Sequence, residues 1–189
     1  MGRVLVVTLR SSLTWGPLGA PEPNSCTEES INLESNRLRM SQPIEQHFRV
    51  SWGDVDGNGH MANIAYLTRS ADTRFLFFFE HGFPNSRFAA EHIGPVILRD
   101  ELVYRKELRL LQEFTVDLQM VGLSPDGGRF RIQNTFRNSA GEVTAIVTSE
   151  GLWFDLVNRR PRAPPPDLDL AQRAFPRGDP FVELPGGPQ

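Results

Sequence analysis

Polar side chains suited to attack on a carbonyl group gather in one glycine-rich segment, residues 52–63. They are Asp54, Asp56, His60 and Asn63. The segment follows an alternating apolar pattern and precedes a helical one. A carboxylate beside a helix N-terminus can act as a nucleophile or a base, because free backbone N–H groups of the first turn stabilise a developing oxyanion. The segment therefore indicates a catalytic carboxylate.

The same segment also matches the start of a calcium-binding EF-hand loop. Asp54, Asp56, Asn58 and Gly59 stand at the first ligand and turn positions of such a loop. The loop needs a bidentate glutamate at its last position and a helix in front of it. Ala65 stands at the last position here, and the preceding residues alternate as a strand. A calcium site is therefore disfavoured.

A second competing match is to a dinucleotide-binding fingerprint formed by Gly57, Gly59 and Ala62. In that motif the pyrophosphate lies against the start of the helix. Asp54 and Asp56 stand directly before the glycines and would repel it. The chain that follows shows no second crossover helix, so this match is weaker than the first.

The third match carries a family resemblance. The run Asp54-Val-Asp56-Gly-Asn-Gly59, followed closely by a long helix, resembles the 4-hydroxybenzoyl-CoA thioesterase family of hotdog-fold acyl-CoA thioesterases. Their pattern is Asp-x-Asp-x-x-Gly before the central helix. The resemblance covers roughly residues 46–164, including the order of one strand, loop, helix and four further strands. His60 and Asn63 fit a branch of the family with a different spacing, which leaves the acyl group open.

The resemblance implies an enzyme that hydrolyses an acyl-CoA or acyl-carrier-protein thioester to a carboxylic acid and a thiol, without a cofactor. Asp56 is then the catalytic carboxylate, as nucleophile or as base for water, and the N–H of Asn63 is the oxyanion donor. His60 takes part in catalysis or orders the loop. A homodimer or homotetramer with the pocket at the subunit interface is also implied. The alternatives are a non-catalytic module that binds acyl thioesters or a protein, and a hotdog dehydratase, whose longer motif is missing.

Further residues are expected at the substrate. Asp54 and Gly59 are candidates in the loop, although an aspartate there is more often a cap for backbone donors. Arg105, Lys106 and Arg109 form a basic cluster that either holds the phosphates of coenzyme A or is an ordinary charged turn. Asp72, on the helix, is the second choice for the catalytic carboxylate. The remaining histidines lack metal-ligand spacing, so no metal is expected.

The elements that must position these residues can be read from hydrophobic periodicity. Residues 44–52 alternate as a strand, with Trp52 expected in the core. A helix of about 20 residues follows and stops near Gly82, with an apolar stripe at three- and four-residue steps. The stripe is Ile64, Leu67, Ala71, Phe75 and Phe78. Strands are predicted at 93–104, 114–120, 130–136 and 143–154. This order predicts an α+β hotdog fold, a long central helix wrapped by a curved antiparallel sheet of about five strands.

Composition sets the outer limits. The chain has 189 residues, 39% hydrophobic and 23% charged, with a formal net charge of −3 spread along the sequence. No basic block points to nucleic acid or a membrane surface, and no apolar run suits a membrane span. One cysteine, Cys26, allows no internal disulfide. A soluble cytoplasmic protein is expected.

Three segments are predicted. Residues 1–39 form a disordered extension, residues 40–160 the hotdog domain, and residues 161–189 a proline-rich tail that runs extended with one short helical turn near 168–174.

Overall fold

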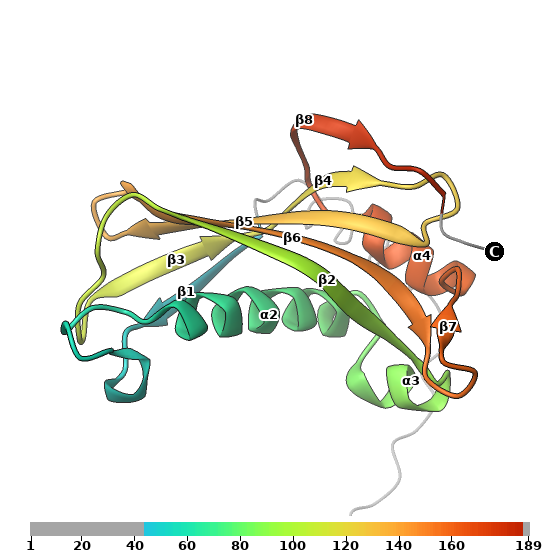
Figure 1. Cartoon of the computed structure of the whole chain (residues 1–189), viewed down its shortest axis with the longest axis horizontal. Coiled ribbons are helices and arrows are strands. Elements are labelled where there is room, and N and C mark those ends of the chain that lie inside the picture. Colours follow the sequence, from blue (N-terminus) through green and yellow to red (C-terminus); the bar gives the residue numbers. More distant parts are fainter. Residues whose placement is uncertain (1–43, 187–189) are drawn as a thin grey trace, which may run out of the picture.

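The fold is known from a computed structural model that describes residues 44–186. One long helix lies across the concave side of a strongly curved sheet (Figure 1). The helices are η1 (Trp52–Asp54), α2 (Asn63–Glu80), α3 (Asn85–Ala90) and α4 (Pro166–Arg173). The strands are β1 (Glu45–Arg49), β2 (Ile93–Tyr104), β3 (Glu113–Asp117), β4 (Gln119–Leu123), β5 (Arg129–Asn138), β6 (Val143–Asp155), β7 (Arg160–Pro161) and β8 (Arg177–Glu183). The predicted α+β class and central helix are confirmed.

The strands form one eight-stranded sheet, larger than the sheet of about five strands that was predicted. Strand β6 pairs with β2 and β5, and the other side of β5 pairs with both β3 and β4. All pairings are antiparallel except that of β4 with β8. Within residues 44–186, β2 pairs only with β6 and is therefore an edge strand of the sheet.

The strand predicted at 114–120 is divided into β3 and β4. Asp117, at the division, uses its carboxylate oxygen to accept the backbone N–H of Thr135, at 2.8 Å. Its carbonyl oxygen accepts the side-chain amide of Asn134, at 2.9 Å. Side-chain hydrogen bonds thus replace ladder bonds at this bend, which periodicity cannot reveal. Burial raises the pKa of Asp117.

The buried face of α2 is rotated from the predicted apolar stripe. Of the five predicted positions only Phe78 is buried, and Ile64 is 68% exposed. The helix residues that are buried are Ala65, Tyr66, Ser70, Thr73, Phe77 and Phe78. Thr73 satisfies its hydroxyl by donating to the carbonyl of Arg69, at 2.8 Å. Two buried hydroxyl side chains in the middle of the face explain why hydrophobicity alone misplaced it.

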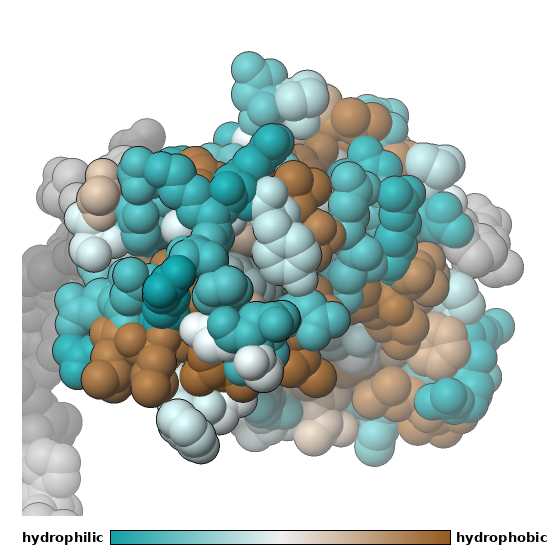
Figure 2. All heavy atoms as spheres, turned by 60° about the vertical axis from the view of Figure 1, so that its left-hand side comes forward, coloured by the Kyte–Doolittle hydropathy of each residue, from teal (hydrophilic) through white to brown (hydrophobic). Residues whose placement is uncertain are grey.

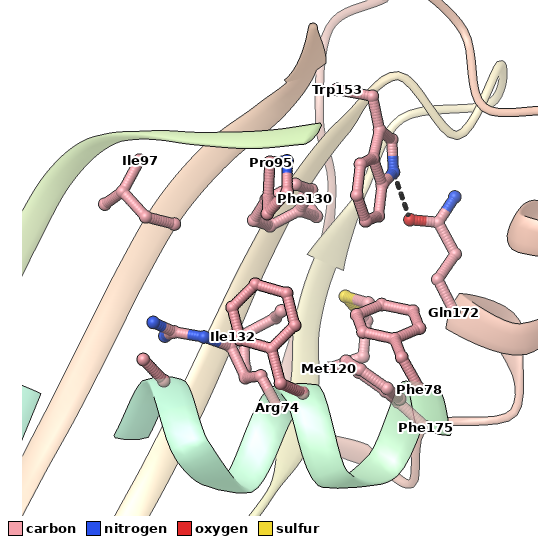
Figure 3. A pocket seen from close by; sticks show the side chains of 12 residues that line it. Arg74, Phe78, Pro95, Ile97, Met120, Phe130, Ile132, Trp153, Gln172 and Phe175 are labelled. Carbon is pink, nitrogen blue, oxygen red and sulfur yellow. Dashed lines mark hydrogen bonds between the residues drawn. The ribbon is translucent and has the colours of Figure 1, made fainter. Parts of the chain in front are cut away.

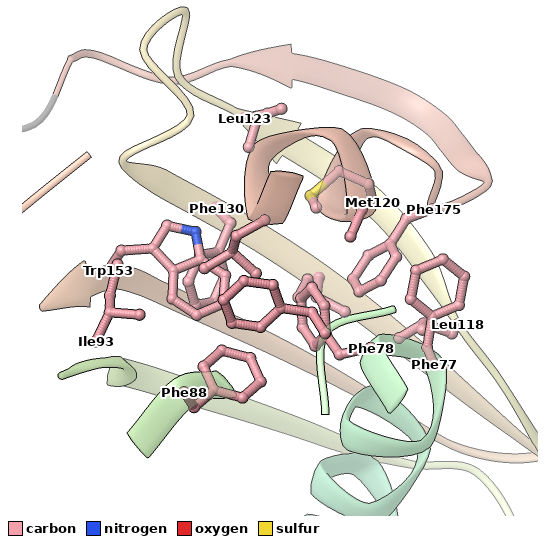
Figure 4. Close-up of a cluster of buried hydrophobic side chains, with 14 residues drawn as sticks. Phe77, Phe78, Phe88, Ile93, Leu118, Met120, Leu123, Phe130, Trp153 and Phe175 are labelled. Atoms are coloured by element: carbon pink, nitrogen blue, oxygen red, sulfur yellow. The ribbon is translucent and has the colours of Figure 1, made fainter. Parts of the chain in front are cut away.

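Two separate cores pack along α2. The first core lies at the start of the helix and includes Tyr66, Leu108 and Phe136. The second core lies at its end and is rich in aromatic rings (Figure 4), including Phe78 and Trp153. The buried polar residues Ser70 and Thr73 separate the two along the helix.

The C-terminal segment departs from the predicted extended tail. Its predicted helical turn is the helix α4, and β8 joins the sheet beside β4. Leu168, Ala171 and Phe175 belong to the second core. The side chain of Gln172, also buried, accepts the indole N–H of Trp153, at 2.9 Å. The expectation of an extended course is therefore wrong for this segment, whereas the division of the chain into three segments stays a prediction.

Two further expectations can be compared with the structure. Trp52 is 82% exposed, so its predicted place in the core is wrong, because the strand ends at Arg49 and the chain turns into η1. The predicted extension 1–39 lies outside the described residues. Within those residues, no helix has the length and hydropathy needed to cross a membrane.

Candidate active site

The loop between β1 and α2 is held by Asp54. Its carboxylate accepts the backbone N–H of Ser51 at 2.8 Å and the Ser51 hydroxyl at 2.6 Å, which caps η1. It also forms an ion pair with Arg69 of α2, at 3.1 Å. Burial acts to raise the pKa of Asp54, but the hydrogen bonds from Ser51 and Arg69 outweigh it and hold the pKa below 3.8. Asp54 therefore fastens the loop to the helix.

The carboxylate of Asp56 is exposed at the next turn of the loop. One of its oxygens accepts the backbone N–H groups of Asn58, at 2.8 Å, and His60, at 3.3 Å. Gly59 closes the turn with a φ of +78°, a backbone conformation that residues other than glycine rarely adopt. The hydrogen bond from Asn58, with that from His60, lowers the pKa of Asp56. Asp56 is therefore ionised at neutral pH.

The N-terminus of α2 follows directly. Ala62 is the N-cap residue, and it has no side chain that could accept a hydrogen bond from the first turn. The side-chain oxygen of Asn63 accepts the N–H of Ile64, at 2.8 Å. Among the described residues, the backbone N–H of Asn63 donates to no acceptor. This donor, at the positive end of the helix dipole, is therefore free to bind an oxyanion.

Asp56, His60 and Asn63 line one surface depression of about 540 Å³. The wall opposite the loop comes from the end of β2 and the residues after it. The other lining residues are Met61, Ala62, Tyr66, Tyr104, Arg105, Lys106 and Glu107. The structure thus brings together the three residues predicted to be catalytic and two of the three predicted basic residues.

Glu107 is a member of the site that sequence reasoning missed. Its carboxylate lies 2.8 Å from Nε2 of His60 and accepts Nε of Arg109, at 2.9 Å. The hydrogen bond from Arg109 lowers the pKa of Glu107. In the sequence Glu107 lies among basic residues, far from His60. No local pattern there indicates that the two side chains meet. Arg109 is thus engaged by Glu107 and is not among the lining residues.

Two tyrosines that had not been predicted form part of the lining. Tyr66 is buried on α2, and its ring meets that of Tyr104 edge-on, with 5.6 Å between centroids. Burial raises the pKa of Tyr66 to about 12. Its phenol therefore stays protonated well above neutral pH.

The basic residues differ in how they are held. Lys106 forms an exposed ion pair with Glu142, at 2.5 Å. The side chain of Arg105 makes no hydrogen bond or ion pair within residues 44–186. Arg105 is therefore the cation at the rim that is free to meet an incoming anion.

Several predicted residues lie outside the depression. Asp54 and Gly59 shape the loop but do not line it. Asp72, the second choice for the catalytic carboxylate, pairs with Arg69 at 3.1 Å and faces a different groove, which Phe75 also lines. The geometry therefore separates Asp72 from the loop residues.

Figure 2 shows the molecule with the left-hand side of Figure 1 turned forward. Polar side chains cover much of this face, and apolar side chains gather in patches between them.

Residues 50–172 match the thioesterase-like superfamily, and they make up most of the chain. The L-carnitine dehydrogenase/betainyl-CoA thioesterase of Agrobacterium fabrum is 25% identical over 151 residues, which cover 79% of this chain and 31% of that protein. The chain thus spans about a third of the length of this curated relative.

Solved structures resemble the fold at lower identity. A hypothetical protein from Staphylococcus aureus, in complex with CoA, has a TM-score of 0.66 and 21% identity, covering 76% of this chain and 90% of its own. A 1,4-dihydroxy-2-naphthoyl-CoA thioesterase from Synechocystis has a TM-score of 0.62 and 11% identity, covering 69% and 95%. These likenesses show a shared fold.

Proposed function

The chain belongs to the thioesterase-like superfamily and has its hotdog fold, and on this premise we propose that it is an acyl-CoA thioesterase with Asp56 as the catalytic carboxylate. The observation that carries the proposal is the meeting of an ionised carboxylate and a free helix N-terminus in one depression. Asp56 and Asn63 both line it, and the N–H of Asn63 has no acceptor within residues 44–186. An acyl-carrier-protein thioester presents the same reacting group and is the alternative substrate.

The reaction replaces the C–S bond of the thioester by a C–O bond from water. Asp56 either attacks the carbonyl carbon itself, giving an anhydride that water then opens, or removes a proton from the attacking water. In both routes the carbonyl oxygen becomes negative and accepts the N–H of Asn63. The sulfur leaves as a thiolate and takes up a proton.

His60 acts in this scheme as a positioning residue. Its backbone N–H donates to Asp56 at 3.3 Å, and its ring is held by Glu107. The imidazole therefore fixes the turn that presents the carboxylate. Arg105 and Lys106 line the depression, and we infer that they meet the phosphates of coenzyme A.

A second function remains in competition, a module that binds acyl thioesters or a protein without turnover. The observation in its favour is that the Asp56 oxygen already accepts two backbone N–H groups of its own turn. An aspartate in such a turn can serve the loop alone. The two functions differ in turnover, which an assay can measure directly.

We also propose a homodimer or homotetramer. The edge strand β2 is 12 residues long and exposes Leu98 and Tyr104. Long apolar edge strands invite pairing with another chain. On α2, Phe79 is 65% exposed and Leu76 is 40% exposed, so this face of the helix also offers apolar surface to a partner.

The test is release of free thiol from a panel of short, long and aromatic acyl-CoAs by wild type and by Asp56→Asn. Asparagine keeps the side-chain oxygen that accepts the N–H groups of Asn58 and His60, so the fold should persist. Hydrolysis of the best substrate should fall by roughly 10²- to 10⁴-fold. Asp72→Asn is the matched control and should be nearly neutral.

Two outcomes would contradict this assignment. Wild-type turnover in Asp56→Asn, with loss in Asp72→Asn, would move the catalytic group to the helix. Absence of hydrolysis of every acyl-CoA by wild type, together with CoA-dependent thermal stabilisation, would favour the binding module.

A further inference from the structure

The proposed hydrolysis leaves one proton without an assigned source. The C–S bond breaks with its electron pair on sulfur, and a thiol such as that of cysteine has a pKa of about 8.5. Protonation during departure therefore stabilises the thiolate. The donor has to lie beside the reacting group, among the residues that line the depression at Asp56. Those with acid–base side chains are Asp56, His60, Tyr66, Tyr104, Arg105, Lys106 and Glu107.

Most of these side chains do not give up a proton near neutral pH. Hydrogen bonds lower the pKa of Asp56 and of Glu107, so both are already ionised. Tyrosines and lysines lose their protons only near about pH 10, and arginine keeps its proton in proteins. Burial raises the pKa of Tyr66 further, to about 12. Histidine is the side chain that exchanges a proton near neutral pH, which leaves His60.

A separate cavity supplies no alternative donor. It lies between α2, the sheet and α4 (Figure 3), measures about 210 Å³ and shares no lining residue with the depression. Its one charged residue is Arg74, which donates to the hydroxyl of Ser149 at 2.8 Å. Even where a dimer brings the cavity of a partner close to the depression, its lining therefore contains no group that gives up a proton near neutral pH.

The imidazole of His60 is held at one ring nitrogen and open at the other. Nε2 lies 2.8 Å from a carboxylate oxygen of Glu107. Because an ionised carboxylate only accepts hydrogen bonds, Nε2 carries the hydrogen. The other oxygen of Glu107 accepts Nε of Arg109, at 2.9 Å. Within residues 44–186, Nδ1 of His60 makes no hydrogen bond. Proton exchange is therefore confined to Nδ1.

The charges around His60 come from two segments. In its own loop, the carboxylate of Asp56 accepts the backbone N–H of His60, at 3.3 Å. Besides the hydrogen bonds that dominate, the charge of His60 also lowers the pKa of Asp56 and of Glu107. The imidazolium therefore interacts with two carboxylates. The start of α2 adds only uncharged side chains to the depression. The charged residues of the segment after β2 are Arg105, Lys106, Glu107 and Arg109.

We propose that His60, besides holding its turn, is the general acid that protonates the leaving thiolate, and that Glu107 is its positioning residue; this rests on the proposed thioesterase. As the C–S bond breaks, its electron pair stays on sulfur and takes the proton from Nδ1. The imidazolium becomes the neutral tautomer with hydrogen on Nε2, which Glu107 still accepts. The attacking water releases one proton to solvent, and solvent returns one to Nδ1, so thioester and water give acid and thiol.

The first test compares two thioesters of the same acyl group, one of N-acetylcysteamine and one of thiophenol. An aryl thiolate is the weaker base and leaves without protonation. His60→Gln keeps an N–H for Glu107 but has no proton to give. Its kcat/KM for the alkyl thioester should fall by roughly 10²-fold, whereas that for the aryl thioester should barely change. His47→Gln, an exposed histidine on β1, is the control and should change neither.

The second test is the pH dependence of kcat/KM for the best acyl-CoA, measured with the full chain. A general acid works only while it is protonated, so the wild-type rate should fall on the alkaline side, and this fall should vanish in His60→Gln. Glu107→Gln keeps an acceptor for Nε2 but removes the anion that stabilises the imidazolium. The fall should therefore begin at a lower pH. Glu113→Gln, an exposed glutamate that is also paired with an arginine, should keep the wild-type profile.

Equal losses on both thioesters in His60→Gln, or an alkaline fall that persists in it, would overturn the general acid. An unchanged profile in Glu107→Gln would overturn its positioning role. A loss confined to the alkyl thioester in His60→Gln, with wild-type turnover in Asp56→Asn, refutes only the assignment of Asp56. Loss of turnover in Asp56→Asn with equal losses in His60→Gln refutes only the general acid. Absence of hydrolysis of every thioester by wild type overturns both.

Discussion

At the scale of single residues, two aspartates of one loop have different tasks. Asp54 is buried, and its carboxylate accepts hydrogen bonds from Ser51 and pairs with Arg69. Asp56 is exposed and lines the depression. Both pKa values are lowered, in each case by hydrogen bonds donated to the carboxylate. A lowered pKa alone therefore does not distinguish a structural aspartate from a catalytic one. The distinction comes from whether the side chain lines the depression.

The structural task of Asp54 can be measured as stability. Asp54→Asn removes the charge that Arg69 and Ser51 bind, and because the group is only 9% exposed, we expect a loss of about 2–3 kcal/mol in the free energy of unfolding. Urea denaturation gives the value. Asp72→Asn removes the more exposed partner of Arg69 and should cost less than about 1 kcal/mol. Equal losses in the two variants would contradict the assignment.

The same carboxylate predicts a dependence on pH. In the folded protein the pKa of Asp54 lies below its ordinary value of 3.8. Its contribution to the free energy of unfolding is therefore complete above pH 3.8, and it is lost as the pH falls through the pKa of the folded state. The stability advantage of wild type over Asp54→Asn should therefore be constant near neutral pH and shrink below about pH 4. Urea titrations over that range test this, and an advantage that persists unchanged in strong acid would contradict it.

At the scale of elements, hydrophobic periodicity predicted the strands and the helix whose local sequence pattern is strong. The predicted strand at 93–104 agrees with the bounds of β2, and the predicted helix end at Gly82 lies close to that of α2. Glycine-containing turns at residues 124–128 and 139–142 connect β4 to β5 and β5 to β6. These elements combine long apolar patterns with strong turn residues, so local preference and tertiary packing agree.

The prediction of an extended C-terminal segment is wrong because proline is compatible with particular positions in helices and strands. Pro166 stands in the first turn of α4, where the missing N–H has no helical partner to lose. Pro180 lies in β8, at an edge of the sheet, where a missing donor is tolerated. Both prolines therefore stand at positions that the helix and the strand tolerate. The burial of Leu168 in the second core stabilises α4.

The candidate site was predictable only as far as it is local. Asp56, His60 and Asn63 belong to one loop, and a motif can show them together. Tyr104, at the end of β2, and Glu107, which follows it, line the same depression, so only the pairing of distant segments reveals them. An isolated bridge between His60 and Arg109 is one such pairing.

The docking of α4 depends on one buried polar side chain. Gln172 accepts the N–H of Trp153 and donates to the carbonyl of Gly127, at 3.0 Å. Gln172→Met keeps the volume but leaves both groups buried without a partner, so we expect a loss of about 2–3 kcal/mol in the free energy of unfolding. Leu170→Met, on the exposed face of α4, is the control and should be neutral. A neutral Gln172→Met, measured by urea denaturation, would show that α4 docks through apolar contacts alone.

At the scale of the whole molecule, the open edge of the sheet predicts assembly. Light scattering should give a dimer or a multiple of it, with a melting temperature that rises with concentration. Leu98→Lys places a charge on the exposed edge strand and should shift the equilibrium toward monomer. Val157→Lys, an exposed position in the turn after β6, is the control and should not. A wild-type monomer at micromolar concentration would contradict the assembly.

The division of the interior into two cores bears on how this protein can diverge. Energetic effects of substitutions add when the sites are well separated and share no neighbours. The first core supports the loop of Asp56, and the second surrounds a small apolar cavity between α2, the sheet and α4. Side chains such as Met120 and Phe175 can therefore change in size without disturbing the loop. Duplicated genes for such a chain can therefore change the second core one substitution at a time while the loop of Asp56 keeps its geometry.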